Sequence, residues 1–196
     1  MRLAHLPILA GLAVLASCGD STSPDVTVSG SASFTFTGGG GGTFSATGGI
    51  SAADINSSTV PYTKNFAAGY TSSTDNSTNV VANVPTTGGL SNLMVVTFKG
   101  QTAGTGTISG TCSSSSTVSC NDVFFEIGQS AGGSSYSYLC FTTSGTVTVT
   151  SISSTNVTGS FSGSGSCVTP TGATSAFVVT NGTFNVPLLP ATPNIK

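Results

Sequence analysis

The chain has 196 residues, and only 5% of them are charged, against about 25% in ordinary globular proteins. Four basic residues, six acidic residues and a single histidine give a formal net charge of −2. So few cations leave no basic patch for nucleic acid or for anionic lipid headgroups. A folded domain of this composition has to stay in solution through Ser, Thr, Asn and Gly.

The first eighteen residues have the order of features found in lipoprotein leaders. Arg2 provides the positive charge that precedes the apolar run of a signal peptide. Residues 6–15 form this apolar run, which is too short to span a membrane. The run ends in Leu15–Cys18 (LASC), which resembles the lipobox of bacterial lipoproteins, where the chain is cut before the cysteine and the cysteine is acylated. The resemblance implies a signal peptide over residues 1–17 and lipidation of Cys18. A plain secretory signal with an incidental cysteine is the alternative.

A lipid anchor implies a location in the cell envelope, with the membrane as a partner through the lipid. Gly19 follows the cysteine, in place of the aspartate that often retains such lipoproteins in the inner membrane. This favours the outer membrane, and the choice between its periplasmic and surface sides stays open. Residues 18–25 are polar and lack apolar periodicity, which predicts a flexible tether.

Four cysteines remain after Cys18, and an even number in an exported chain favours disulfides. Of the three possible pairings we favour Cys112–Cys120, which closes a Ser-rich loop, together with Cys140–Cys167, which follows from the strand register below. A zinc site is the alternative, but the chain lacks the C-x₂-C pairs that such sites favour. We therefore predict two disulfides and no metal site.

The first half of the chain opens with a strong strand signal. Apolar and polar residues alternate from Val26 to Phe36, the run Gly38–Gly42 interrupts the pattern, and Phe44 and Ala46 resume it. This predicts a long hairpin with a glycine tip. The tip lacks the Lys-Ser/Thr of a phosphate loop. Residues 48–79 are less regular, with short strands expected at Ser58–Tyr62 and Phe66–Tyr70.

Strand signals are dense from residue 79 onward. Leu93–Phe98 is apolar on both faces, so we expect it in the centre of a sheet, covered from both sides. The other strands are expected at Asn79–Val84, Gly104–Ser109, Val123–Ile127, Tyr136–Thr142, Thr146–Thr150, Val157–Gly163, Ala176–Thr180 and Thr183–Val186.

Two details of register follow from the turn residues. A turn at Ser153–Asn156 sets Ile152 opposite Val157, which puts Thr142 opposite Cys167 and brings Cys140 near that cysteine. Asn181-Gly182 is typical of a two-residue hairpin turn and predicts a closing hairpin.

No segment has a sustained helical period. About ten short strands with frequent turns predict an all-β fold, an antiparallel β-sandwich over residues 26–186, with a closed β-barrel as the alternative. The Pro-rich residues 187–196 are expected to form a tail outside the domain.

Three segments of the second half support a family resemblance: SGTVTVT at 144–150, VTGSF at 157–161 and VTNGTF at 179–184. In this order they resemble the C-terminal half of small bacterial β-sandwich lipoproteins of uncharacterised function. The resemblance covers about residues 93–186. It implies a fold and an envelope location, and it implies no catalytic residues.

Candidate catalytic groups are few. The only histidine, His5, lies in the leader, so histidine-dependent nucleophilic catalysis is excluded for the mature chain. Asp122 and Glu126 lie about 13 Å apart along one strand, too far for the carboxylate pair of a glycosidase. Asp54 and Asp75 lie in loops and could meet.

Two other binding chemistries have weak signals. Asp54–Asn56 and Asp75–Asn79 offer oxygen ligands for calcium, but Asp and Asn are also ordinary turn residues. Sugar binding uses stacked aromatic rings, and Tyr136 and Tyr138 share a strand face, although packing in the core or at an edge is the more common role of such tyrosines.

We therefore predict a membrane-anchored extracytoplasmic lipoprotein that is not an enzyme, is structural or binds a ligand through its loops, and needs no cofactor. No nucleic acid partner is expected, and a protein or glycan partner stays open. The alternatives are a β-barrel carrier of an apolar small molecule and a hydrolase that uses acids alone.

Overall fold

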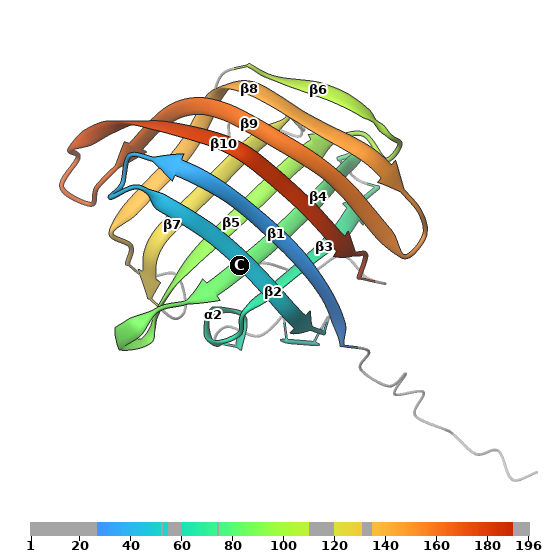
Figure 1. Cartoon of the computed structure of the whole chain (residues 1–196), viewed down its shortest axis with the longest axis horizontal. Helices are drawn as coiled ribbons and strands as arrows, with labels where there is room; N and C mark the ends of the chain where they lie inside the picture. Colours follow the sequence, from blue (N-terminus) through green and yellow to red (C-terminus); the bar gives the residue numbers. More distant parts are fainter. Residues whose placement is uncertain are drawn as a thin grey trace, which may run out of the picture.

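The computed structural model describes residues 27–51, 53–54, 60–73, 75–109, 120–130 and 135–189. Most of these residues lie in strands, so the all-β prediction is confirmed (Figure 1). Residues 53–54 are also helical, and two short helical elements, α2 (Val60–Thr63) and the 3-10 turn η1 (Thr87–Gly89), lie between strands. The strands are β1 (Val28–Thr37), β2 (Gly42–Ile50), β3 (Phe66–Ser72), β4 (Ser77–Pro85), β5 (Leu90–Lys99), β6 (Gly104–Ser109), β7 (Asp122–Ser130), β8 (Tyr138–Ile152), β9 (Asn156–Val168) and β10 (Thr174–Pro187).

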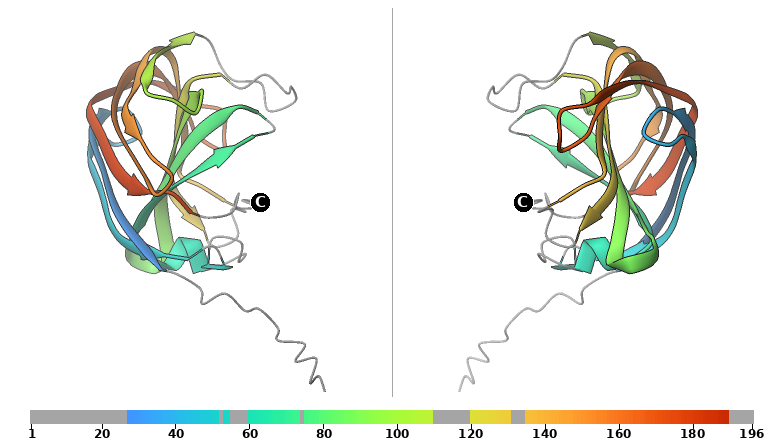
Figure 2. Two further views of the ribbon diagram at one scale, coloured as in Figure 1. Left: turned by 90° about the vertical axis from the view of Figure 1, so that its right-hand side faces the viewer. Right: turned by 90° about the vertical axis from the view of Figure 1, so that its left-hand side faces the viewer.

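All ten strands belong to one antiparallel sheet. Their order is β2-β1-β10-β9-β8-β7-β5-β4-β3, and β6 pairs with β8 beside this path. The two strands at the ends of the order, β2 and β3, contact one another because the sheet curls round on itself (Figure 2). The sheet is therefore nearly closed, which is consistent with both the predicted sandwich and the barrel alternative.

Glycines allow the close approach of backbones where the sheet comes round to meet itself. A Cβ atom on Gly30 of β1 would lie 2.5 Å from the carbonyl oxygen of Ala67 in β3. A Cβ atom on Gly48 of β2 would overlap the carbonyl oxygen of Asn65, just before β3. The chain after β10 also contacts β3 where the sheet meets itself, because the Leu189 N–H donates to the carbonyl oxygen of Gly69 over 2.8 Å.

Phenylalanine rings fill the inside of the curled sheet. Phe34 lies at their centre, with its ring centroid 5.0 Å from that of Phe125 and 5.1 Å from that of Phe44. The period-two pattern of β1 produces this arrangement, since Ala32, Phe34 and Phe36 point inward and are buried. Burial of each such large apolar side chain stabilises the fold by about 1.5–3 kcal/mol.

A second, smaller apolar cluster lies on the other face of β3, β4 and β5. Phe66, Val81 and Leu93 are buried there, together with Ile50 at the end of β2. On β5, Met94 and Val96 belong to the phenylalanine-rich core while Leu93 belongs to the second cluster. The prediction that this strand is central and covered from both sides is confirmed.

The hairpin of β8 and β9 has the predicted start but a different register further on. Ile152 lies opposite Val157 as predicted, whereas Thr142 lies opposite Gly165 and not opposite Cys167. Two bulges, between Thr142 and Ser144 and between Val149 and Ser151, each shift the register by one residue. The expectation for Thr142 was therefore wrong, because sequence periodicity does not reveal bulges.

The predicted closing hairpin at Asn181-Gly182 is wrong. β10 runs without a break from Thr174 to Pro187, between β1 and β9. Asn181 has a positive φ of 55°, at the point where the register with β9 shifts between Val179 and Gly182. The Asn-Gly pair provides the left-handed residue of a bulge, the same backbone conformation that a hairpin turn would use.

Two other predicted segments differ from the structure. Residues 60–62 of the strand expected at Ser58–Tyr62 lie in α2, where Pro61 suits the first turn of a helix, and residues 58–59 lie outside the described ranges. Within the expected tail, Pro187 ends β10 and Leu189 is buried in the second cluster. Residues 190–196 and the predicted signal peptide and tether, 1–17 and 18–25, lie outside the described residues.

Candidate functional site

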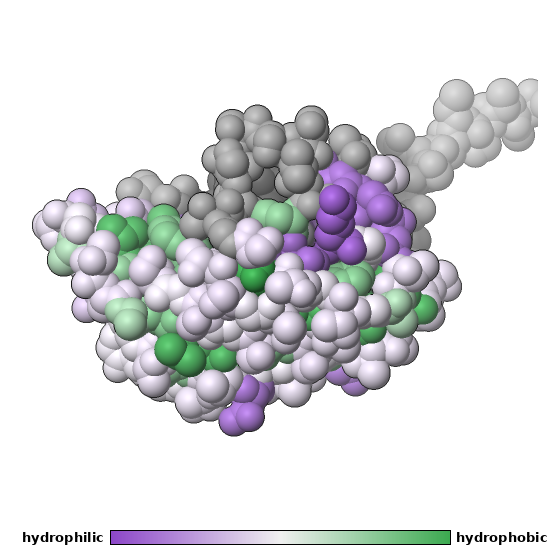
Figure 3. Space-filling model, turned by 90° about the horizontal axis from the view of Figure 1, so that it is seen from above, coloured by the Kyte–Doolittle hydropathy of each residue, from purple (hydrophilic) through white to green (hydrophobic). Residues whose placement is uncertain are grey.

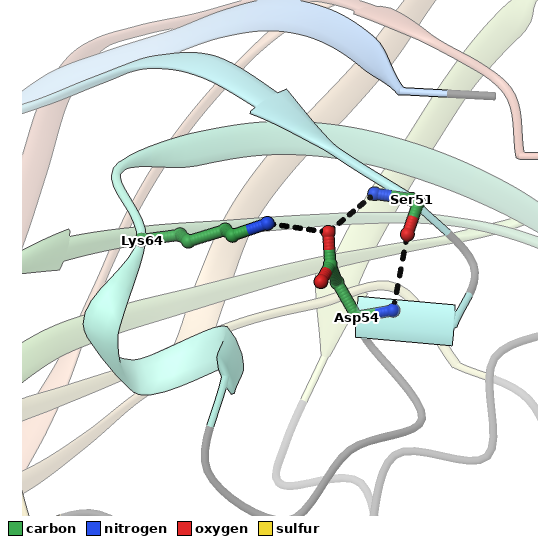
Figure 4. Close-up of polar contacts among 3 residues, drawn as sticks. All are labelled: Ser51, Asp54 and Lys64. Carbon is green, nitrogen blue, oxygen red and sulfur yellow. Dashed lines mark hydrogen bonds and ion pairs between the residues drawn. The ribbon is translucent and has the colours of Figure 1, made fainter. Parts of the chain in front are cut away.

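Asp54 lies in a compact polar arrangement beside α2. Its backbone N–H donates to the Ser51 hydroxyl over 3.1 Å, and its carboxylate accepts the backbone N–H of Ser51 over 3.2 Å. This is the geometry of a capping box at the start of the helical residues 53–54, before α2. The Lys64 ammonium, just after α2, reaches the same carboxylate at 2.6 Å (Figure 4). The hydrogen bond from Lys64, reinforced by those from Ser51, lowers the pKa of Asp54.

Asp54 and Asp75 do not meet. Lys64, the partner of Asp54, precedes the first residue of β3, whereas Asp75 follows the last and accepts a hydrogen bond from the Ser72 hydroxyl over 3.2 Å. Seven strand residues separate the two places by roughly 23 Å. The sequence left open whether these two carboxylates meet, and the structure keeps them apart.

The other two acids of the described chain lie on β7. Asp122 accepts a hydrogen bond from the Thr142 hydroxyl over 3.3 Å, and Glu126 is hydrogen-bonded to the Gln129 side chain. Burial raises the pKa of both carboxyl groups. Both carboxyl groups are therefore partly shielded from solvent, unlike the solvated carboxylates of a turn.

Half-buried Glu126 belongs to a group of polar side chains that we call the polar cluster: Asn83 on β4, Ser91 on β5, and Glu126 and Gln129 on β7. Asn83 and Ser91 are 0% exposed and Gln129 is 4% exposed. Each of the four residues has a buried oxygen atom with no hydrogen-bond partner. Because buried polar atoms are nearly always paired, four such atoms on neighbouring strands mark a candidate binding site.

The cover over the polar cluster comes from α2 and the residue after it. The Asn83 amide donates to the carbonyl oxygen of Lys64 over 2.9 Å. Tyr62 of α2 is 9% exposed, and burial together with the nearby Glu126 raises the pKa of its hydroxyl. The ion pair between Lys64 and Asp54 links the residue after α2 to Ser51, which follows β2.

Sequence reasoning did not find three members of the polar cluster. Asn83 follows Val80, Val81 and Ala82 in a strand that is buried on both faces, and Gln129 continues the alternating strand β7. A polar residue inside an apolar strand was the available signal. The face on which it lies depends on register and on the bulge at Gly128, whose φ is +65°.

A second candidate site is an open hollow at the end of the sheet, which we call the loop hollow. It has a volume of about 370 Å³ and is lined by Gly38–Gly40, Tyr138, Thr169 and Ala173–Ser175. The predicted glycine tip is confirmed, and its turn closes with a hydrogen bond from Gly41 N–H to the Gly38 carbonyl oxygen over 2.9 Å. All of the lining side chains are uncharged.

The glycine tip lies against the predicted disulfide. Cys140 and Cys167 are bonded to one another, as predicted, and occupy opposite positions on β8 and β9. A Cβ atom on Gly39 would lie 3.4 Å from the sulfur of Cys167 and 3.3 Å from the Tyr138 ring. Cys120 is also disulfide-bonded, whereas Cys112, its predicted partner, and Cys18, the predicted lipidation site, lie outside the described residues.

The tyrosines mainly have packing roles. Tyr62 is buried, Tyr70 packs against the second cluster, and Tyr138 packs against the phenylalanine-rich core while lining the loop hollow. Tyr136 precedes β8 and is half-buried. Of the two tyrosines considered for sugar binding, only Tyr138 lines the loop hollow, and Tyr136 does not.

Two further findings concern only the residues that the structure describes. Among them, no group of three or more His, Cys, Asp or Glu side chains could hold a metal ion. In the same ranges, no helix is long and apolar enough to cross a membrane.

Comparisons with protein-family models, with curated proteins and with solved structures gave no match to this chain.

Proposed function

We propose that the chain is a lipid-anchored protein of the bacterial cell envelope that acts by binding and not by catalysis. The lipobox resemblance of Leu15–Cys18 supports the anchor, and a β domain with a cysteine bridge suits an oxidising compartment. The dispersed carboxylates of the described chain support binding over acid catalysis, since Asp54 is held by Lys64 and Asp75 lies at the other end of β3.

The loop hollow is the observation that carries the binding proposal. Three segments far apart in the sequence line it: the glycine tip, Tyr138 and the turn between β9 and β10. Hydroxyl groups of Thr169, Thr174 and Ser175 and one aromatic ring suit a neutral ligand with hydroxyl groups, such as the end of a glycan. We do not place the ligand inside the sheet, because an apolar molecule there would have to displace packed phenylalanine rings.

The surface of the domain is also suited to neutral partners. The strands β1, β2, β6, β8, β9 and β10 contain no charged residue. Hydroxyl pairs link neighbouring strands on the exposed side, including Thr105 with Thr148 at 3.0 Å and Ser144 with Ser164 at 2.9 Å. Seen from above, most of the coloured surface has the pale tint of Ser, Thr and Gly (Figure 3).

A glycan array of neutral oligosaccharides tests the binding site. We expect the full chain to bind a subset of them and Thr174→Arg, which fills the hollow, to lose that binding. Thr180→Arg is the matched control, because Thr180 is exposed on the same strand β10 but does not line the hollow. Equal binding by both variants, or no binding by the wild-type chain, would contradict the proposal.

The anchor is tested separately by replacing Cys18 with serine. We expect the wild-type chain to incorporate a labelled fatty acid and to sediment with membranes, and Cys18→Ser to do neither. A wild-type chain found only in the soluble fraction would refute the anchor and leave the binding proposal intact.

A further inference from the structure

The polar cluster beneath α2 has an excess of hydrogen-bond acceptors. The amide nitrogen of Asn83 is used by the Lys64 carbonyl oxygen, and the Gln129 side chain donates to Glu126. What remains unpaired is oxygen in every case: Asn83 Oδ1, Ser91 Oγ, Glu126 Oε2 and Gln129 Oε1. Carbonyl, hydroxyl and carboxylate oxygens are the ligands that hard cations prefer.

The strand register gathers these four side chains around Ser91. Gln129 lies directly opposite Ser91, and both Asn83 and Glu126 lie opposite Leu93, two residues further along β5. Side chains directly opposite one another have Cβ atoms about 4.5–5.5 Å apart, and diagonal neighbours about 7–8 Å apart, within the reach of long polar side chains. The four side chains therefore lie on one face of the sheet, each opposite or diagonal to Ser91, with Asn83 and Glu126 on the two sides of Leu93.

The charge around the polar cluster fits a single positive charge. Glu126 is its only ionisable member, and the Lys64 ammonium is already paired with Asp54. A divalent ion would keep an unbalanced charge in this buried place, which is costly. We propose that the polar cluster of Asn83, Ser91, Glu126 and Gln129 binds one small monovalent metal cation, sodium or potassium, and that this ion stabilises the domain. The inference does not depend on the lipid anchor or on the loop hollow.

Thermal unfolding of the full chain in a neutral detergent tests the site. The melting temperature is compared in choline, sodium, potassium and calcium chloride at equal ionic strength, because choline is too large for the cluster. At roughly a hundredfold excess over the dissociation constant, we expect sodium or potassium to raise the melting temperature by about 5–10 °C relative to choline. Broadening of the ²³Na resonance by the protein, reversed by potassium, would report binding directly.

Glu126→Gln keeps the shape of the side chain and removes its charge. We expect this variant to lose the difference between sodium and choline. Asp122→Asn is the matched control, because Asp122 is a half-buried carboxyl on the same strand that pairs with Thr142 outside the cluster, and it should keep the difference. Equal melting temperatures in choline, sodium and potassium for the wild-type chain, or a response to calcium alone, would overturn the proposal. So would an unchanged sodium response in Glu126→Gln.

Discussion

At the scale of single residues, Asp54 differs from Asp122 and Glu126 in the direction in which its surroundings shift its pKa. The ammonium of Lys64 lowers the pKa of Asp54, whereas burial raises those of Asp122 and Glu126. A lowered carboxyl pKa adds stability above the ordinary value, and this stability is lost as the pH falls through the folded-state pKa. The Asp54 carboxylate therefore favours the fold at neutral pH, and the two half-buried carboxylates of Asp122 and Glu126 oppose it.

Asp54→Asn should lower the free energy of unfolding by about 0.5–1 kcal/mol at neutral pH, because it removes a partly exposed ion pair. The difference from the wild-type chain should disappear in acid, once Asp54 is protonated. Denaturant unfolding across the pH range measures it, with Lys64→Met and the double variant completing a cycle. Additive effects of the two substitutions would show that the ion pair contributes nothing.

Glu126→Gln should have the opposite effect on stability when small cations are absent. Because burial raises the pKa of Glu126, the wild-type chain loses stability as the pH rises from the ordinary glutamate value to the folded-state pKa. In choline chloride the variant should therefore be more stable than wild type at neutral pH and equally stable in acid. A variant that is less stable at neutral pH in choline would contradict this assignment.

At the scale of elements, bulges decide what the sequence could and could not predict. Alternation located nearly every strand, since a buried face requires apolar residues at every second position, as in β1. The bulges in β7, β8 and β10 left no signal of their own. The Asn181-Gly182 pair was therefore interpreted as a turn, and Asn83, Ser91 and Gln129 of the polar cluster were missed. The predicted disulfide is nevertheless present. Continuous pairing from Ile152 and Val157 already brings Cys140 within two residues of the position opposite Cys167, and the two bulges of the β8–β9 hairpin move it directly opposite.

Asn181→Val tests the bulge in β10. A β-branched residue at a φ of 55° is strained, so we expect a loss of stability of about 1–2 kcal/mol. Asn181→Gly should be close to neutral. Thr180→Val, at the neighbouring exposed position of the same strand, controls for the added apolar surface. Equal stability of Asn181→Val and Thr180→Val in urea unfolding would argue against the strained bulge.

At the scale of the whole molecule, the fold depends on closing one sheet against itself. No local sequence pattern predicts this closure. The residues that permit it are glycines, and the residues that they contact in space, such as Ala67 for Gly30, lie far away in the sequence. The sequence therefore predicted both a sandwich and a barrel, and the nearly closed sheet has features of each.

Gly30→Ala should disturb this closure. The new Cβ atom would meet the carbonyl oxygen of Ala67 at 2.5 Å, so we expect a loss of about 1–3 kcal/mol in the free energy of unfolding. Gly104→Ala on β6 is the control, because its Cβ atom would lie 3.7 Å from the Phe98 ring, an ordinary contact. Equal stability of the Gly30 and Gly104 variants would show that the backbones of β1 and β3 are not closely packed at Gly30.

The central claim is that the chain is a lipoprotein anchored through Cys18. Intact mass spectrometry of the protein extracted from membranes tests it most directly. We expect a chain that begins at Cys18, carries several acyl chains on that residue, and has lost two hydrogens for each disulfide. A chain that begins elsewhere, or that begins at Cys18 without any lipid mass, would contradict it.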